Sequence, residues 1–354
     1  MSEKVLMKGN EALAEAAIRA GCHHFFGYPI TPQTELAAYM SKRLPKIGGT
    51  YLQAESEIAA INMVQGAGAA GIRAMTSSSS PGISLKAEGI SYMAGADVPG
   101  LIINVQRGGP GLGGIQPSQA DYWQATRAMG HGDFHILVFA PSTVQEMVDL
   151  VSDAFDLAET YRMPAMILAD GMLGQMMEPV VFKEKEEKKE IDKSWALTGH
   201  QNKRPHNVVN SLYLQANQLE AKVKERFQRY EKIKAEEARY QTYMTEDAEY
   251  IVVAYGATAR VVQAAVKEAR AEGIKAGCFR PVTLWPFPAA ALKELAGQAK
   301  AFLDVEMSMG QMVDDVKLAI DCSRPVHFYG RTGGVIPEPG EILEEIKKMA
   351  GGVK

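Results

Sequence analysis

Two carboxylates, Glu55 and Glu57, stand at the start of an apolar segment that spans residues 51–71. The order of residue types predicts a short strand, a turn in which Ser56 caps a helix, and a mostly buried helix that ends among glycines. Burial among apolar side chains raises the pKa of a carboxyl group, so one of these glutamates can keep its proton near neutral pH and donate a hydrogen bond to a cofactor nitrogen. The alternative is structural, because acidic residues also favour the first turn of a helix.

Two further side chains suit the recognition of a carboxylate substrate. Thr31 stands between Pro29 and Pro32, which stiffen the loop and present the hydroxyl from an extended backbone. Arg107 follows a predicted buried strand over residues 100–106, at the sheet edge where open α/β folds bind ligands, so its guanidinium is placed to pair with a carboxylate. The structural alternatives are a plain strand-to-helix connector for the proline loop and an exposed surface arginine.

Four consecutive serines, residues 77–80, are followed by Pro81 and Gly82 at the start of a predicted helix. Hydroxyl groups and free amides at a helix N-terminus bind anions or polar ring atoms, which makes this turn a candidate ligand cradle. A serine-rich turn without any ligand has the same pattern. The glycine-dense segment 108–117 matches neither the GxGxxG nor the Walker spacing, so it carries no phosphate fingerprint.

Composition argues against several classes of protein. The chain has 354 residues with 38 basic and 42 acidic side chains, and this balance gives no indication of a nucleic-acid partner. Cys22, Cys278 and Cys322 lack any CxxC spacing and cannot by themselves hold an iron–sulfur cluster or zinc. His131 and His135 lie in a connector, where we expect no metal site. Without a secretory or membrane-spanning run, the sequence predicts a soluble cytoplasmic protein with no membrane partner.

The chain divides into two α/β units joined by a charged segment. Residues 1–180 and 248–354 alternate strand-like and helix-like runs, which predicts doubly wound parallel sheets. Between them, residues 181–247 contain the charged run 183–190 and a predicted long helix over 217–243. That helix is rich in Lys, Glu, Gln and Arg, which is typical of an arm between domains or across a partner.

Several motifs occur in an order that points to one enzyme family. Those before residue 112 are FGYPITPQTE, ESEIAAINMVQGAGAAG, TSSSSPG and NVQRGGPG. Together they resemble the α subunit of the 2-oxoacid:ferredoxin oxidoreductases, thiamine diphosphate enzymes that decarboxylate 2-oxo acids to acyl-CoA, over residues 4–175. The resemblance implies a doubly wound, pyrimidine-type thiamine diphosphate-binding domain. The later motifs VVAYG, FRPVTLWPFP and VEMSMGQ are similar to the transketolase C-terminal-like α/β domain that follows in that family.

The resemblance also implies roles for single residues. In the family, a glutamate that contacts the aminopyrimidine ring lies nine positions before a helix glycine, which matches Glu57 and Gly66 but not Glu55. Glu57 is then the catalytic acid–base residue and a cofactor contact. Thr31 and Arg107 match family residues that contact the substrate.

The serine turn implies further cofactor contacts from Ser78 and Ser79. It departs from the more usual TSGPG of the family, because Ser80 stands where a glycine is expected. The segments MKGNEALAEAAIRAGC and GGIQPSQADYWQA look most like the branched-chain subgroup, which acts on 2-oxoisovalerate (3-methyl-2-oxobutanoate). The 2-oxoglutarate subgroup is the near neighbour.

Other chains must supply the remaining parts of such an enzyme. The sequence has no GDG motif followed about 25 to 30 residues later by Asn, so we expect Mg²⁺ and the diphosphate to be held by a β subunit that shares the thiamine diphosphate. Iron–sulfur clusters are expected on partner subunits, with a γ subunit and a ferredoxin-like δ subunit in the complex. Ferredoxin is the expected electron acceptor and coenzyme A the co-substrate.

These expectations combine into a subunit of an enzyme that converts 2-oxoisovalerate to acyl-CoA and CO₂ with reduction of ferredoxin. A 2-oxoglutarate enzyme, a catalytically silent scaffold subunit and a stand-alone nucleotide-binding module stay open as alternatives. A scaffold could dispense with Thr31, Glu57 and Arg107, whose joint presence argues against it. A nucleotide-binding module should bind its nucleotide without any partner.

Overall fold

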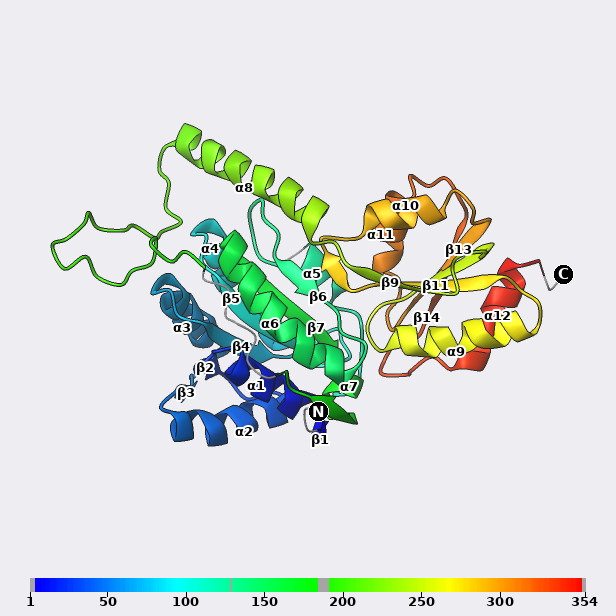
Figure 1. Ribbon diagram of the computed structural model, residues 1–354, viewed down its shortest axis with the longest axis horizontal. Helices are drawn as coiled ribbons and strands as arrows, with labels where there is room; N and C mark the ends of the chain where they lie inside the picture. The colour runs from blue at the N-terminus through cyan, green and yellow to red at the C-terminus, as the bar shows by residue number, and fades with distance from the viewer. Residues whose placement is uncertain (1–3, 128, 184–190, 352–354) are drawn as a thin grey trace.

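The computed structural model of the chain describes residues 4–127, 129–183 and 191–351. It has two α/β units, each built around its own large sheet, and one long helix beside the first unit (Figure 1). The predicted α/β class is therefore confirmed. No helix in these three ranges is long and apolar enough to cross a membrane.

The first unit is organised around a seven-stranded sheet with the order β12-β6-β7-β5-β4-β2-β3. Strands β2 to β7 are parallel, and β12 pairs with β6 in the antiparallel direction. The parallel arrangement places the carboxyl ends of β2 to β7 along one edge, where open α/β sheets bind ligands. The strand bounds are His24–Gly27 (β2), Thr50–Gln53 (β3), Ala74–Ser78 (β4), Gly100–Gln106 (β5), Leu137–Phe139 (β6), Pro164–Asp170 (β7) and Thr283–Trp285 (β12).

Helices cover both faces of this sheet, which explains why every residue of β5 and β7 is buried. Helix α1 packs against α2 and α6, whereas α3 packs against α4. A short antiparallel pair, β1 with β8, lies apart from the large sheet. The bounds are Lys4–Lys8 (β1), Gly9–Arg19 (α1), Thr34–Arg43 (α2), Leu44–Ile47 (η1), Glu57–Ala69 (α3), Ser80–Gly95 (α4), Tyr122–Thr126 (α5), Val144–Tyr161 (α6), Gly171–Gln175 (α7) and Met177–Val181 (β8).

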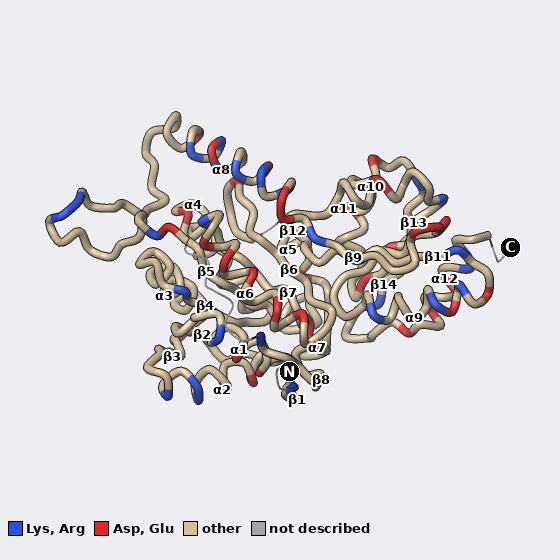
Figure 2. Tube along the Cα trace, viewed as in Figure 1, with Lys and Arg blue, Asp and Glu red and all other residues tan. Residues whose placement is uncertain are grey.

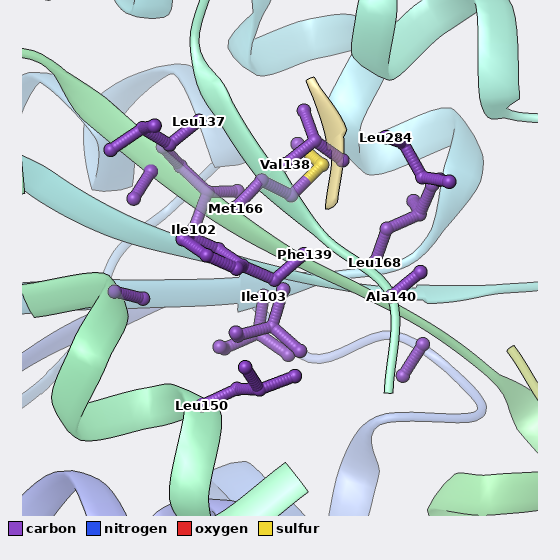
Figure 3. Close-up of a cluster of buried hydrophobic side chains, with 14 of the residues drawn as sticks. Ile102, Ile103, Leu137, Val138, Phe139, Ala140, Leu150, Met166, Leu168 and Leu284 are labelled. Carbon is purple, nitrogen blue, oxygen red and sulfur yellow. The ribbon is translucent and has the colours of Figure 1, made fainter. Parts of the chain in front are cut away.

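An apolar cluster forms the centre of the first unit (Figure 3). It combines side chains of β5, β6 and β7 with Leu150 of α6, and Leu284 of β12 joins it. Because β12 belongs to the C-terminal half of the sequence, that half contributes both a strand and a core side chain to the first unit. The labelled members of the cluster are Ile102, Ile103, Leu137, Val138, Phe139, Ala140, Leu150, Met166, Leu168 and Leu284.

The second unit has a five-stranded sheet with the order β14-β13-β10-β11-β9. Strands β10, β11, β13 and β14 are parallel, as the alternation of strands and helices predicts, and β9 is antiparallel to β11. The bounds are Tyr240–Tyr243 (β9), Tyr250–Val253 (β10), Thr258–Ala271 (α9), Ala276–Pro281 (β11), Ala289–Leu295 (α10), Ala301–Glu306 (β13), Met312–Ala319 (α11), Val326–Gly330 (β14) and Pro339–Met349 (α12).

The long helix predicted over residues 217–243 is wrong at its C-terminal end. Helix α8 spans Ala216–Glu236, and residues 240–243 form strand β9 instead. Their sequence, Tyr-Gln-Thr-Tyr, has the aromatic and β-branched side chains that favour strands, and pairing with β11 decides the outcome.

Helix α8 docks on the first unit through a few side chains and keeps a charged outer side. Both signs of charge follow one another along it (Figure 2), and some form ion pairs one turn apart, such as Lys224 with Glu220. On the buried side, the Tyr230 hydroxyl donates to the carbonyl oxygen of His135 at 3.1 Å. The charged run expected before this helix falls almost wholly on residues 184–190, which lie outside the described residues.

Gln119 ties the two units together. Its side-chain amide donates to the carbonyl oxygen of Tyr255 at 2.9 Å, and its carbonyl oxygen accepts from the Thr258 hydroxyl and the Met307 amide at 2.9 and 3.0 Å. The Tyr255 hydroxyl in turn donates to the Gln119 backbone oxygen at 3.0 Å. Because Gln119 is 1% exposed, these groups have no access to water as an alternative partner.

Replacing Gln119 by leucine should therefore destabilise the whole chain. The change keeps the approximate volume but leaves three buried polar groups unpaired, so we expect a loss of roughly 3 kcal/mol or more in the free energy of unfolding. Chemical denaturation measures this loss. Gln116→Leu, at an exposed position of the same loop, is the matched control, and equal stability of the two variants would contradict the role of Gln119.

Candidate functional site

The carboxyl edge of the first sheet gathers the polar residues that the sequence singles out. Thr31 follows β2, the serine turn ends β4 and opens α4, and Arg107 follows β5 directly. Glu57 begins α3, the helix after β3. These connections bring residues from distant parts of the sequence to one side of the sheet, as a parallel sheet requires.

The structure separates the two glutamates at the start of α3. Ser56 caps the helix as predicted, since its hydroxyl oxygen accepts from the Ala59 amide at 3.2 Å. Glu57 is 6% exposed, whereas Glu55 is exposed to solvent. The prediction of a mostly buried helix is wrong at Ile58, which is 49% exposed. Successive helix positions point about 100° apart, and Glu57 takes the inward position of the first turn.

Gly82 allows the Glu57 carboxylate and the serine turn to meet. A Cβ atom at Gly82 would lie 2.1 Å from Ser78 Oγ and 2.7 Å from Glu57 Oε1. Both distances are far below van der Waals contact, so only glycine fits this position without moving its neighbours. The carboxylate of α3 and the hydroxyl at the end of β4 therefore converge on the first turn of α4.

Several hydroxyls of β4 and the serine turn are buried without a partner. Thr76 Oγ1, Ser78 Oγ and Ser79 Oγ have no hydrogen bond to any residue that the structure describes, although all three residues are fully buried. Buried polar groups are normally paired, so unpaired hydroxyls beside a carboxylate mark a place where a polar ligand can bind. Ser77 differs, because its hydroxyl donates to Gln33 Oε1 at 2.5 Å.

Ser80 connects the serine turn to the arginine. Its hydroxyl donates to Asp121 Oδ2 at 2.6 Å and accepts from the Arg107 amide at 3.0 Å. The backbone φ of Ser80 is 20°, at the border of the region that favours glycine, which agrees with the glycine expected there. Burial raises the pKa of the Asp121 carboxyl, while hydrogen bonds from Ser80 and Asn104 oppose that rise.

Arg107 is a buried residue, 7% exposed, so the interpretation as a surface arginine is wrong. Its Nη1 donates to the carbonyl oxygen of Thr31 at 3.0 Å, and its Nη2 donates to the carbonyl oxygen of Leu112 at 3.1 Å. The Nε group has no partner among the described residues. The arginine thus holds the proline loop and the glycine-dense loop together and keeps donor capacity for a ligand.

A pocket of about 650 Å³ opens beside Thr31, between the edge of the first sheet and a loop of the second unit. Most of its lining is apolar, and Ile336 comes from the loop that precedes α12. The lining residues are Thr31, Pro32, Ile115, Gln116, Pro117, Gly171, Met172, Gln175, Met176 and Ile336. This pocket depends on residues far apart in the chain, and no local sequence signal indicates it.

Lys86 is a further charged residue of this region that sequence analysis missed. It lies on α4, has no exposed surface, and its Nζ donates to the carbonyl oxygen of Glu57 at 3.4 Å. Burial lowers the pKa of Lys86 from 10.5 to about 8, and the charge of Glu57 opposes part of this decrease. The available signal was a single lysine on an otherwise weakly polar helix.

Two family models together cover most of the chain. Residues 15–255 match the thiamine diphosphate-binding domain of pyruvate flavodoxin/ferredoxin oxidoreductases, and residues 248–342 match core domain II of pyruvate:ferredoxin oxidoreductase. The chain belongs to the 2-oxoacid:ferredoxin oxidoreductase family. The resemblance that the motifs indicate is therefore confirmed.

Relatives with full-length matches carry two different substrate names. The ketoisovalerate oxidoreductase subunit VorB of Methanothermobacter marburgensis is 49% identical over 98% of each chain. The 2-oxoglutarate synthase subunit KorA of the same organism is 37% identical over 99% of this chain and 100% of that protein. Both are named as subunits, which places this family member among the components of multi-subunit enzymes.

Solved structures agree with this assignment. The 2-oxoglutarate:ferredoxin oxidoreductase of Magnetococcus marinus, solved with 2-oxoglutarate, coenzyme A and succinyl-CoA bound, matches 98% of this chain with a TM-score of 0.84 and 28% identity. The match covers 65% of that longer chain. A split-gene transketolase matches 96% of this chain with a TM-score of 0.60 and 14% identity, which shows a shared fold.

The residues at the carboxyl edge fit thiamine diphosphate, the ligand in the name of the first family model. A buried carboxylate can hydrogen-bond a pyrimidine nitrogen, and the unpaired hydroxyls of Ser78 and Ser79 can meet polar atoms of the ring. Gly82 leaves open the space into which a Cβ atom would project. These three features support a binding place for the pyrimidine half of the cofactor.

The buried Lys86 gives a stability prediction that needs no cofactor. Its pKa is lower in the folded chain, so the folded state binds fewer protons between pH 8 and 10.5. The cost of burying the charge is full below pH 8 and disappears as pH rises through 10.5. Lys86→Met should therefore raise the unfolding free energy at pH 7 by up to about 3 kcal/mol, with the advantage gone above pH 10.5.

Denaturant titrations of both proteins across pH 7 to 11 check this expectation, with the pH range set by the two pKa values of Lys86. Lys42→Met, at an exposed position of α2, controls for the loss of a lysine as such. A constant difference between the native chain and Lys86→Met across the whole range would contradict the lowered pKa.

Proposed function

We propose that this chain is the α subunit of a thiamine diphosphate-dependent enzyme that oxidatively decarboxylates a branched-chain 2-oxo acid, 2-oxoisovalerate, to acyl-CoA and CO₂ with reduction of ferredoxin. The observation that carries the proposal is the meeting of the buried Glu57 carboxylate with the serine turn at Gly82, on the same sheet edge as the Arg107–Thr31 pair. Full-length similarity to subunits of two such enzymes supports it.

Glu57 is the proposed catalytic residue. Thiamine diphosphate, when bound, supplies a nucleophilic carbon at C2 of its thiazolium ring and an electron sink for decarboxylation. Glu57 then holds a proton between its carboxylate and the pyrimidine N1′, which is general acid–base catalysis at a group remote from the reacting carbon. Ser78 and Ser79 offer their unpaired hydroxyls to the same ring.

Arg107 and Thr31 are the proposed substrate-binding residues. The Arg107 side chain is fixed by two backbone carbonyl oxygens, and its remaining N–H groups can bind the carboxylate that every 2-oxo acid carries. Thr31 is exposed beside it and lines the pocket. Recognition and cofactor activation thus use different residues.

The rest of the active site belongs to partner subunits in this proposal. A β subunit holds Mg²⁺ and the diphosphate, and γ and ferredoxin-like δ subunits with iron–sulfur clusters pass electrons to ferredoxin. The sequence supports this division, because it has three separated cysteines and no diphosphate motif. We assign residues 1–180 to the pyrimidine-type domain, 181–247 to the connecting arm and 248–354 to the transketolase C-terminal-like domain.

The pocket beside Thr31 favours a branched aliphatic side chain over the second carboxylate of 2-oxoglutarate. Its described lining contains no Lys, Arg or His residue. The nearby Arg260 contacts Met176 Sδ at 3.1 Å, but its guanidinium is already paired with Glu178 at 2.8 Å. An apolar pocket stabilises the methyl groups of 2-oxoisovalerate, whereas an unpaired carboxylate there would lose its hydration.

Glu57→Gln should lower the rate of deuterium exchange at C2 of bound thiamine diphosphate in the reconstituted complex. The amide keeps the size of the carboxyl but cannot change protonation state, and general acid–base groups contribute about 10² to 10⁴ in rate. NMR follows the exchange. Glu55→Gln is the matched control at the exposed neighbour, and equal effects of the two changes would refute the assignment.

Arg107→Lys should lower kcat/KM for the 2-oxo acid by roughly 2 kcal/mol or more, because lysine keeps the charge but loses the planar fork. Thr31→Val should act in the same direction, at a cost of about 1 to 3 kcal/mol. Neither change should alter C2 exchange much, since neither residue contacts Glu57. Arg19→Lys on α1, where the side chain is half exposed, is the control. Unaltered kcat/KM in Arg107→Lys would remove the arginine from the substrate site.

Met172→Lys should move substrate preference toward 2-oxoglutarate. A cation in the pocket can pair with the second carboxylate and repels no group of that substrate, whereas it places an unpaired charge against the methyl groups of 2-oxoisovalerate. We expect the ratio of the two kcat/KM values to change by about 10-fold or more. Met177→Lys, 55% exposed and outside the pocket, should leave the ratio unchanged. The same ratio in both variants would place the substrate side chain elsewhere.

A further inference from the structure

Lys86 lies at the closest contact between α3 and α4. On the face of α4 that meets α3, Gly82 precedes it by one turn and Gly89 follows it by almost one turn. A Cβ atom at Gly82 would lie 2.7 Å from Glu57 Oε1, and one at Gly89 would lie 2.5 Å from Ile61 Cγ2. The two helices therefore close around the Lys86 side chain, which has no exposed surface.

An amine at this place lowers the stability of the chain. Among the described residues, the hydrogen-bond partner of Lys86 Nζ is the carbonyl oxygen of Glu57, at the long distance of 3.4 Å, although an ammonium group has three donors. That oxygen belongs to the first turn of α3, where the helix dipole is unfavourable to a cation. A methionine would fill the same space without either penalty. Buried charges that lower stability are concentrated at functional sites.

Glu57 is the ionisable group that acts on Lys86. Helix α4 packs against α3, β5 and β7. Strand β5 has no ionisable side chain, and β7 has Asp170 at its end, where the carboxylate accepts from the Met172 and Leu173 amides. Asp121, near the start of α4, is held by Ser80 and Asn104. Glu57 on α3 remains as the carboxylate whose charge favours the protonated form of Lys86.

We propose that Lys86 is a positioning residue for Glu57, whose carboxylate form its ammonium charge stabilises while the Glu57 proton moves to the bound pyrimidine nitrogen. This inference rests on the proposed function. The proton leaves the Glu57 carboxyl oxygen and arrives at the ring nitrogen, and Lys86 keeps its three protons throughout. A cation near the carboxylate favours that transfer, because it lowers the free energy of the charge that develops on Glu57.

The charge on Lys86 also couples cofactor binding to proton uptake. Burial lowers the pKa of the Lys86 amine to about 8, so part of the population is neutral at pH 8. A full negative charge on Glu57 in the bound state raises the affinity of Lys86 for a proton. Binding at this pH should therefore take up protons from the buffer, and a residue of purely structural importance would cause no such uptake.

The test uses the complex co-expressed with its partner subunits in four forms: native, Lys86→Met, Lys86→Arg and the exposed control Lys42→Met. Titration calorimetry with thiamine diphosphate at pH 8, in two buffers with different ionisation enthalpies, counts the protons taken up. We expect roughly 0.3 to 0.5 proton per site for the native and Lys42→Met complexes. Both Lys86 variants should lose this uptake, because methionine binds no proton and arginine keeps its own.

Exchange at C2 gives the second readout. Lys86→Met should be slower by about 5-fold or more at pH 7, whereas Lys86→Arg should stay within about 2-fold of the native rate and show no alkaline decrease near the pKa of lysine. If Lys86→Met does not assemble, Lys86→Gln replaces it. Unchanged proton uptake and exchange in the neutral variant overturn the role of Lys86, and so does an assembled Lys86→Arg complex that is as slow as Lys86→Met. A native complex that shows no heat of cofactor binding overturns the proposed function itself.

Discussion

The close approach of α3 and α4 is the constraint on which the site depends. Both helices begin at the carboxyl edge of the same sheet, and glycines at positions 82 and 89 let their first turns come together. A Cβ atom at position 82 would force the Glu57 carboxylate away from the serine turn. The unpaired hydroxyls of that turn, the buried carboxylate and the buried Lys86 amine all lie where they do because two helices can approach without side chains between them.

Arg107 combines two tasks that are often divided between residues. Its backbone lies against the Ser80 hydroxyl, and its guanidinium bridges the proline loop at Thr31 and the glycine-dense loop at Leu112. A glycine-dense loop has high conformational entropy when free, so a fixed cation that binds its carbonyl oxygen limits the shapes that the loop adopts. The residue proposed to bind the substrate carboxylate is thus also the one that orders the walls around it.

Much of this arrangement could be predicted from local sequence. The serine before Glu57 marks the helix start, and the helix phase then buries Glu57 while Glu55 stays outside. What could not be predicted depends on contacts between distant residues. Lys86 meets Glu57 across 29 positions of sequence, and the pocket beside Thr31 is completed by Ile336 of the other unit. Residues 240–243 form a strand because a partner strand is available, which local helix propensity cannot indicate.

Strand β12 has a consequence for the integrity of the first sheet. It comes from the C-terminal half of the sequence, yet it covers the outer side of β6 and inserts Leu284 into the core of the first unit. An uncovered β6 would present a row of free backbone amide and carbonyl groups beside an apolar cluster, which is the kind of surface through which chains aggregate. The C-terminal half therefore protects the N-terminal half from self-association, and during synthesis this protection is missing until β12 has left the ribosome.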